Sequence, residues 1–183
     1  IAFHQADKEI YDKLRYSLLL VNIYEKHGSS NQKVEAYNQL GKLYFNERLF
    51  AKSVEQYKKA ISLEGDQKKA SFETQMGLIK AQKQARDLDD AIVSASILEF
   101  KSGMTNTQKV EVLKEKASIY HDLKAFPQEL ESYESILPLV KSSQQAYLEP
   151  TIWNNIGYTN KYLNKYAAAK GICWYNRCCS KWL

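Results

Sequence analysis

Histidine and cysteine are the residues whose chemistry is easiest to recognise in a sequence, because both ligate metals and act in catalysis. The three histidines stand far apart, at His4, His27 and His121. Only His121 has a carboxylate beside it, Asp122, and adjacent side chains diverge on a helix instead of converging on one ion. The histidines are therefore expected to lie on the surface, and they predict no metal site.

Cysteine is confined to the end of the chain, at Cys173, Cys178 and Cys179. This spacing lacks a second ligand pair at a familiar zinc distance, and the preceding sequence offers no disulfide framework. Residues 173–183 also lack the charged, helix-like residue pattern of the preceding sequence, so they are interpreted as an atypical tail rich in Cys and Trp. No metal and no other cofactor is predicted.

Known catalytic motifs are equally absent. The chain has no glycine-rich phosphate loop, no Gly-x-Ser-x-Gly elbow and no His-Glu-x-x-His pair. Asp89 and Asp90 are adjacent, so their carboxylates do not converge on one substrate. Acidic residues here are better explained as charge that complements the positive end of a helix dipole. The sequence predicts that the protein is not an enzyme.

The charge pattern argues against a nucleic-acid binder. The net charge is +5, but 26 Lys and Arg are interspersed with 21 Asp and Glu and do not gather in blocks. The longest apolar stretch, residues 18–23, is too short to cross a bilayer, so no membrane insertion is predicted. A cytoplasmic location is favoured over a periplasmic one. The chain does not begin with Met, and we expect it to be part of a longer protein.

Helical periodicity is strong, whereas strand-like alternation is absent. In residues 34–63, apolar side chains recur every three or four positions. This spacing predicts two helices, each with one apolar face. Only residues 46–48 separate the two helices, a break that suits an antiparallel helix pair. The chain has 7 Gly and 3 Pro, which favours long helices over many short strands. An all-α fold of about nine helices is predicted.

This two-helix pattern recurs along the chain. When the sequence is aligned with itself at a shift of 76 residues, similar residues align. Gly41, Tyr44 and Tyr57 then align with Ala117, Tyr120 and Tyr133. Half that shift, 38 residues, lays Leu40 on Leu78, and a further copy contains Gly157. Self-similarity at such a period is typical of a solenoid.

The clearest copy resembles the tetratricopeptide repeat (TPR) signature, with Tyr37-x2-Leu40-Gly41-x2-Tyr44 followed by Ser53-x3-Tyr57-x2-Ala60. Trp153-x2-Ile156-Gly157, with Ala169 further on, matches the signature independently. The other two copies depart from it, since Ile79 and Glu129 stand where small residues are usual. The resemblance covers roughly residues 31–172, with a period of 38 to 40 instead of the usual 34.

The resemblance implies a right-handed α-solenoid of antiparallel helix pairs, a TPR-like superhelix. Gly41 on the first helix of a repeat would meet Ser53 on the second, which lets the two backbones approach closely. Gly157 and Ala169 would do the same. Residues 1–28 are expected to be the remainder of a preceding repeat, and residues 29–172 to hold the repeats, at about 31–67, 68–104, 105–143 and 144–178.

The resemblance also implies where a partner would bind. In this family, residues at fixed offsets on the first helix of each repeat face a concave groove. Carried over, the predicted groove residues are Asn38, Lys42, Asn46, Lys80, Lys114, Asn154 and Tyr158. The same offsets also select Met76, Gln84, Ser118, Asp122 and Tyr162. Lys42 stands where the family's two-repeat carboxylate clamp has Asn, so that clamp is not reproduced.

Lysines and asparagines at these offsets would form a polar, mildly basic surface for a protein or peptide, an acidic one included. Solvated lysines on exposed helices are the alternative interpretation. The favoured function is a protein-interaction scaffold, with the sensor or adaptor part of a bacterial signalling protein as its setting. The alternative function is a structural spacer or a self-association module without a peptide ligand.

Overall fold

The computed structural model describes residues 2–141 and 145–164, and all regular structure in these ranges is helical. The predicted all-α fold is therefore confirmed. The described residues form eight α-helices, α1 to α8, and one short 3-10 helix, η1. The ninth predicted helix would fall in residues 165–178, outside the described residues. The chain divides into two compact units, residues 1–94 and residues 95–183.

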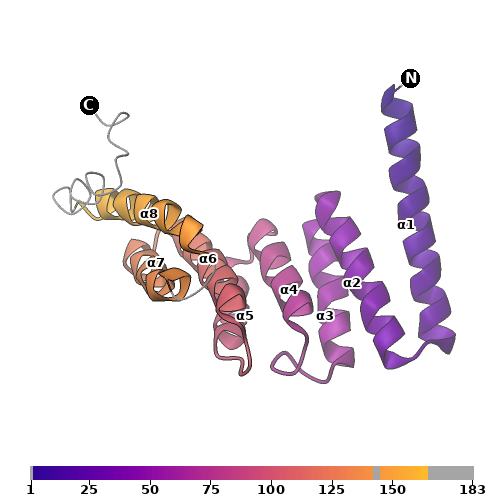
Figure 1. The fold of residues 1–183 in the computed structure, drawn as a ribbon. Helices are drawn as coiled ribbons and strands as arrows, with labels where there is room; N and C mark the ends of the chain where they lie inside the picture. Colours follow the sequence, from indigo (N-terminus) through magenta and orange to yellow (C-terminus); the bar gives the residue numbers. More distant parts are fainter. Residues whose placement is uncertain (1, 142–144, 165–183) are drawn as a thin grey trace. The chain divides into compact units, whose positions relative to one another are not determined.

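In unit 1 the helices from α1 to α4 form a row in which each packs against the next (Figure 1). It contains α1 (Ala2–His27), α2 (Ser30–Asn46), α3 (Phe50–Leu63), α4 (Phe72–Gln84) and the first part of α5 (Leu88–Glu99). The pairs in contact are α1 with α2, α2 with α3, and α3 with α4. Val54, Tyr57 and Ile61 on α3 form a core cluster with Leu78 and Ala81 on α4.

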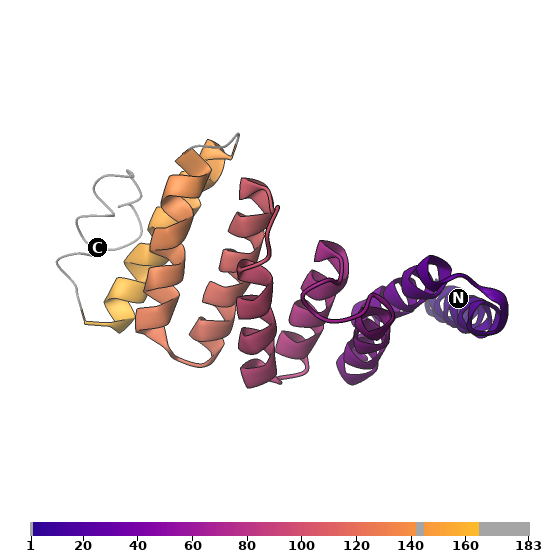
Figure 2. The same ribbon diagram turned by 90° about the horizontal axis from the view of Figure 1, so that it is seen from below.

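Unit 2 repeats this arrangement with α6 (Asn106–Asp122), α7 (Phe126–Lys141), η1 (Ala146–Leu148) and α8 (Glu149–Tyr162). Helix α7 packs against both α6 and α8, as Figures 1 and 2 show. The core of unit 2 draws on all three helices, and Ile136 of α7 and Ile152 of α8 are completely buried in it. Each such side chain stabilises the fold by about 1.5–3 kcal/mol relative to an exposed one.

Local sequence signals explain where the helices begin. Ser29 caps α2 and Thr105 caps α6, and in both cases the residue three positions later is a Gln that completes a capping box. The sequence suggests Ser30 as the start signal, whereas the capping residue is its neighbour Ser29. Pro150 lies in the first turn of α8 and does not kink a helix, because the missing N–H is not needed there.

The turn between the two helices of each repeat recurs in the same form. Its residues with positive φ are Arg48, Arg86, Lys124 and Asn164, which lie 38, 38 and 40 residues apart along the chain. In the first three turns the next N–H donates to a carbonyl five residues back, as Leu49 does to Tyr44 at 2.8 Å. The recurrence of this turn confirms the predicted period of 38 to 40.

The first repeat is longer than the second both in its helices and in the connection that follows it, because α2 and α3 have 17 and 14 residues whereas α4 and α5 have 13 and 12. Eight residues, from Glu64 to Ser71, connect α3 to α4. Glu64 organises this connection, because its carboxylate accepts a hydrogen bond from the Ser71 backbone N–H at 2.8 Å. Asp66 does so as well, because it accepts one from the Lys69 N–H at 2.9 Å. The extra length of this repeat therefore comes from longer helices together with a long inter-repeat connection.

The centre of unit 1 is the ring of Tyr57, which lies between two helical glycines. A Cβ atom added at Gly41 of α2 would stand 3.2 Å from the ring, and one added at Gly77 of α4 only 2.4 Å from it. Ser53 donates a hydrogen bond to the Gly41 carbonyl at 2.8 Å and is fully buried. The predicted close approach of Gly41 and Ser53 is thus confirmed.

Sequence reasoning assigned the matching small position of the second repeat to residue 79, where Ile79 departs from the signature. Ile79 is completely buried, and the close approach is made by Gly77, two residues earlier. Gly157 is half-buried on α8. Its expected counterpart, Ala169, lies outside the described residues, so the packing predicted for Gly157 stays a prediction.

Candidate functional site

The predicted groove residues divide between the two units, and each set belongs to the first helix of a repeat, here called helix A. Helices α2 and α4 are the A helices of unit 1, and α6 and α8 are those of unit 2. On α2, Lys42 and Asn46 are exposed and four residues apart, so they share one face. On α4, Lys80 is half-buried, Gln84 is exposed and Met76 is buried. Met76 is therefore a core residue and not a contact for a partner.

Asn38 links the two A helices of unit 1. Its side-chain amide donates to the Thr74 hydroxyl of α4 at 2.9 Å, and Thr74 is itself bonded to the capping Ser71. The amide oxygen of Asn38 is buried and accepts no hydrogen bond from any described residue. A buried acceptor without a donor costs about 1–3 kcal/mol.

In unit 2 the A helices present a different surface. Lys114 on α6 is exposed, and so are Asn154 and Tyr158 on α8, which share a face at i and i+4. Tyr162 follows one turn later, and the two tyrosines are 44% and 54% exposed. The face of α8 therefore carries one amide followed by two open phenol rings, the residue type that interfaces favour.

The second of these rings belongs to an aromatic cluster that joins three helices. Tyr162 stacks on Phe126 of α7 with ring centroids 4.7 Å apart and planes within 5°. His121 of α6 meets both rings edge-on, at 5.8 Å from Tyr162 and 6.0 Å from Phe126. Sequence reasoning treats His121 as a surface residue, and its side chain is indeed 48% exposed. What the sequence does not reveal is its ring partners.

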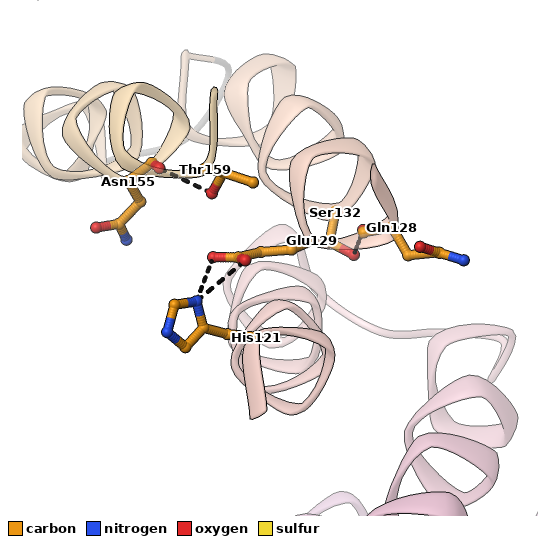
Figure 3. A network of polar contacts seen from close by, with 6 residues as sticks. All are labelled: His121, Gln128, Glu129, Ser132, Asn155 and Thr159. Atoms are coloured by element: carbon orange, nitrogen blue, oxygen red, sulfur yellow. Dashed lines mark hydrogen bonds and ion pairs between the residues drawn. The ribbon is translucent and has the colours of Figure 1, made fainter. Parts of the chain in front are cut away.

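A buried carboxylate fixes His121 in this cluster. Glu129 of α7 is only 4% exposed, and its two oxygens lie 3.1 and 3.2 Å from Nδ1 of His121 (Figure 3). Two hydroxyls in that view donate within their own helices, Ser132 to the Gln128 carbonyl and Thr159 to the Asn155 carbonyl. Glu129 is the residue that departs from the small side chain usual at its position, and that departure was the available sequence signal.

Tyr133 lies in the same part of unit 2. Burial raises its pKa to about 12, the negative charge of Glu129 adds to the rise, and a hydrogen bond with Asn155 opposes it. In the unfolded chain the phenol ionises near its usual pKa of about 10. Between these two pH values the unfolded state releases the proton first, so alkaline pH favours unfolding.

We therefore expect the stabilisation linked to Tyr133 to be complete below about pH 10 and to be lost as the pH rises through about 12. The urea midpoint of the wild type should fall on going from pH 8 to pH 11, and that of Tyr133→Phe should fall less because Phe does not ionise. Equal falls for the two proteins would show that Tyr133 is not the group responsible.

Two features are absent from the described part of the chain. Within residues 2–141 and 145–164, no cluster of three or more His, Cys, Asp or Glu is arranged to hold a metal ion. In the same ranges, no helix has the length and apolar character needed to span a membrane. Cys173, Cys178 and Cys179, with the tail that contains them, lie outside the described residues.

Comparison with known proteins agrees with the helix pairing. Residues 34–67, which run from α2 through α3 into the following turn, match the tetratricopeptide repeat family. These residues are therefore similar to a single TPR. No curated protein sequence matches the chain. TPR-like repeats are generally modules for protein–protein interaction, because stacked repeats present long binding surfaces.

Solved structures share the fold at low sequence identity. A putative kinesin light chain with nearly identical TPR-like repeats from Podosopora anserina matches with a TM-score of 0.79 at 12% identity, over 97% of this chain and 90% of that one. A substituted variant of the same protein gives 0.79 at 11%, over 97% and 89%. BtubC (BKLC) from P. vanneervenii gives 0.72 at 15%, over 96% and 72%. The fold of this chain is therefore TPR-like.

Proposed function

We propose that the chain is a protein-interaction module whose helix A faces bind an extended, acidic segment of a partner protein. The observation that carries the proposal is the aromatic surface of unit 2, where Tyr158, Tyr162 and His121 are open to solvent and the last two are held by the aromatic cluster. Exposed aromatic residues with hydrogen-bonding groups are enriched in binding hot spots. Rings held by stacking and by a buried carboxylate lose little freedom on binding, which favours affinity.

The basic side chains of the A helices supply the second part of the proposal. Lys42 and Lys114 are exposed and Lys80 is half-buried, so all three reach the surface of their helices. Their charge would attract an acidic segment and speed its association. Asn46 and Asn154, also exposed, would hydrogen-bond the backbone of an extended chain. A sensor or adaptor role in a signalling protein would be one setting for this module.

The test is selection of short peptides displayed on phage against the whole chain, followed by affinity measurements on the selected peptides. We expect acidic sequences to be enriched. The double variant Tyr158→Ala/Tyr162→Ala should weaken binding at least about tenfold, because truncating a hot-spot aromatic residue costs about 2 kcal/mol or more. Tyr147→Ala is the matched control, since Tyr147 is 72% exposed in η1, outside the A helices. Equal binding by the double variant and the control would contradict the proposal.

The lysines are tested separately. Replacing Lys42, Lys80 and Lys114 with Ala should weaken binding and flatten its dependence on salt, because exposed charges are screened beyond about 8–10 Å at physiological ionic strength. Stability should change by only about half a kcal/mol per substitution. The control replaces three exposed lysines outside the A helices, Lys52, Lys58 and Lys68. If both triple variants bind and respond to salt alike, the helix A lysines do not contact the peptide.

A further inference from the structure

His121 lies where three helices of unit 2 meet. It belongs to α6, and its ring meets Phe126 of α7 edge-on at 6.0 Å and Tyr162 of α8 edge-on at 5.8 Å. Its side chain is 48% exposed, so the imidazole can exchange a proton with the solvent while it stays in contact with both rings. Histidine is the side chain that ordinarily changes charge between pH 5 and 8. A change of charge at His121 therefore takes place inside the aromatic surface of unit 2.

The contact with Glu129 determines which ring nitrogen takes up the proton. The two carboxylate oxygens of Glu129 lie 3.1 and 3.2 Å from Nδ1 of His121. A carboxylate only accepts hydrogen bonds, so Nδ1 carries the hydrogen that is donated, and Nε2 is the nitrogen left to be protonated. In Figure 3 the Nε2 side of the ring points away from the carboxylate. Proton uptake therefore leaves the contact between His121 and Glu129 in place.

Uptake of one proton changes the charge of this surface by one unit. Glu129 is only 4% exposed, so its negative charge is screened by salt less than a surface charge would be. With a neutral imidazole the pair carries one negative charge beside Tyr162, and with an imidazolium it carries none. An acidic segment on this surface is repelled in the first state and is not repelled in the second.

Other ionisable side chains surround the pair. On α7 and α8 they are Tyr133 and Tyr162, and next to His121 and Tyr162 in the sequence they are Asp122, Lys124 and Lys161. Tyrosine, aspartate and lysine ordinarily keep their charge between pH 5 and 8. His121 is the member of this set whose residue type changes charge in that range.

We propose that His121 makes binding on the aromatic surface of unit 2 depend on pH, so that an acidic segment binds more tightly when His121 is protonated. This inference rests on the proposed function, because it concerns the same surface and the same class of partner. An exposed charge pair contributes up to about fivefold in affinity, which sets the size of the effect. Tyr158 and Tyr162 supply the contact area at either pH, and His121 adjusts its strength.

The first test measures the affinity of an acidic peptide, selected against the wild-type chain, at about pH 5.5 and about pH 8 by fluorescence anisotropy. The wild type should bind about three- to fivefold more tightly at the lower pH. His121→Gln should lose this gain, because glutamine does not titrate. His27→Gln is the matched control, since His27 is an exposed histidine at the end of α1, in unit 1. It should keep the gain.

A second measurement needs no peptide. In NMR spectra of the whole chain, the ring signals of Tyr162 should move between about pH 8 and about pH 5.5 in the wild type and stay in place in His121→Gln, because the two rings are in contact. Fixed Tyr162 signals in the wild type would overturn the proposal. A His121→Gln protein that keeps the pH-dependent gain in affinity would overturn it as well. Absence of peptide binding at both pH values would overturn the proposed function and this regulation together, whatever the Tyr162 signals do.

Discussion

Gly77→Ala is expected to destabilise unit 1 by about 1–3 kcal/mol, although the same substitution inside an exposed helix would stabilise it by about 1 kcal/mol. The added Cβ would lie 2.4 Å from two atoms of the Tyr57 ring. On its other side the ring faces Gly41, where an added Cβ would stand 3.2 Å from it, so a shift away from Gly77 brings the ring towards the α2 backbone. Urea denaturation of the variant and the wild type measures the difference.

Two further variants show whether the ring of Tyr57 is the cause. Tyr57→Leu removes the ring, so adding Gly77→Ala to it should cost much less than in the wild-type background. Gly41→Leu should cost at least about 1–3 kcal/mol, because the larger side chain overpacks the same contact. A Gly77→Ala protein that unfolds at or above the wild-type urea concentration would show that α3 and α4 do not pack this closely.

His121→Ala is expected to destabilise unit 2 by about 1–2 kcal/mol. Breaking a fully buried pair typically costs roughly 3–5 kcal/mol, and the loss here is smaller because the His121 side chain is about half exposed to solvent. The loss arises because the Glu129 carboxylate, only 4% exposed, would keep its burial and lose its partner. Glu129→Ala removes the buried charge and places the family's usual small residue at that position. It should therefore cost less than His121→Ala.

The double variant His121→Ala/Glu129→Ala completes the cycle. We expect its stability to be close to that of Glu129→Ala alone, because the histidine has no charge to partner once Glu129 is gone. Urea denaturation of the four proteins near neutral pH gives the coupling energy. Additive effects of the two substitutions would mean that the pair contributes nothing beyond its separate side chains.

The repeat architecture was predictable because its signals are local. Tyr37, Leu40, Gly41 and Tyr44 lie on one helix, so their spacing alone indicates the helix and its packed face. The turns with positive φ, such as Arg48, recur at the period that the sequence predicts, with a residue other than glycine in the left-handed position each time. Tyr57 likewise fills the space beside Gly41 that the signature assigns to it.

The contacts that define the candidate site depend on where different helices meet, which spacing does not encode. Asn38 bonds to Thr74, 36 residues later, so its role depends on the placement of the next repeat. His121 and Glu129 lie on different helices, joined by a turn that brings them together. The repeat register selects Ile79 and not Gly77, although a glycine inside a helix usually has a packing reason.

Photo-crosslinking is the most direct test of the claim that the helix A faces bind a protein segment. A benzophenone amino acid replaces Tyr158 in one variant and Tyr147 in another, and each is irradiated with an acidic peptide selected against the wild-type chain. Both positions are exposed tyrosines of unit 2, but only Tyr158 lies on an A helix. We expect a covalent adduct from position 158 and none from position 147. Adducts from position 147 alone, or equally from both, would contradict binding on the helix A face.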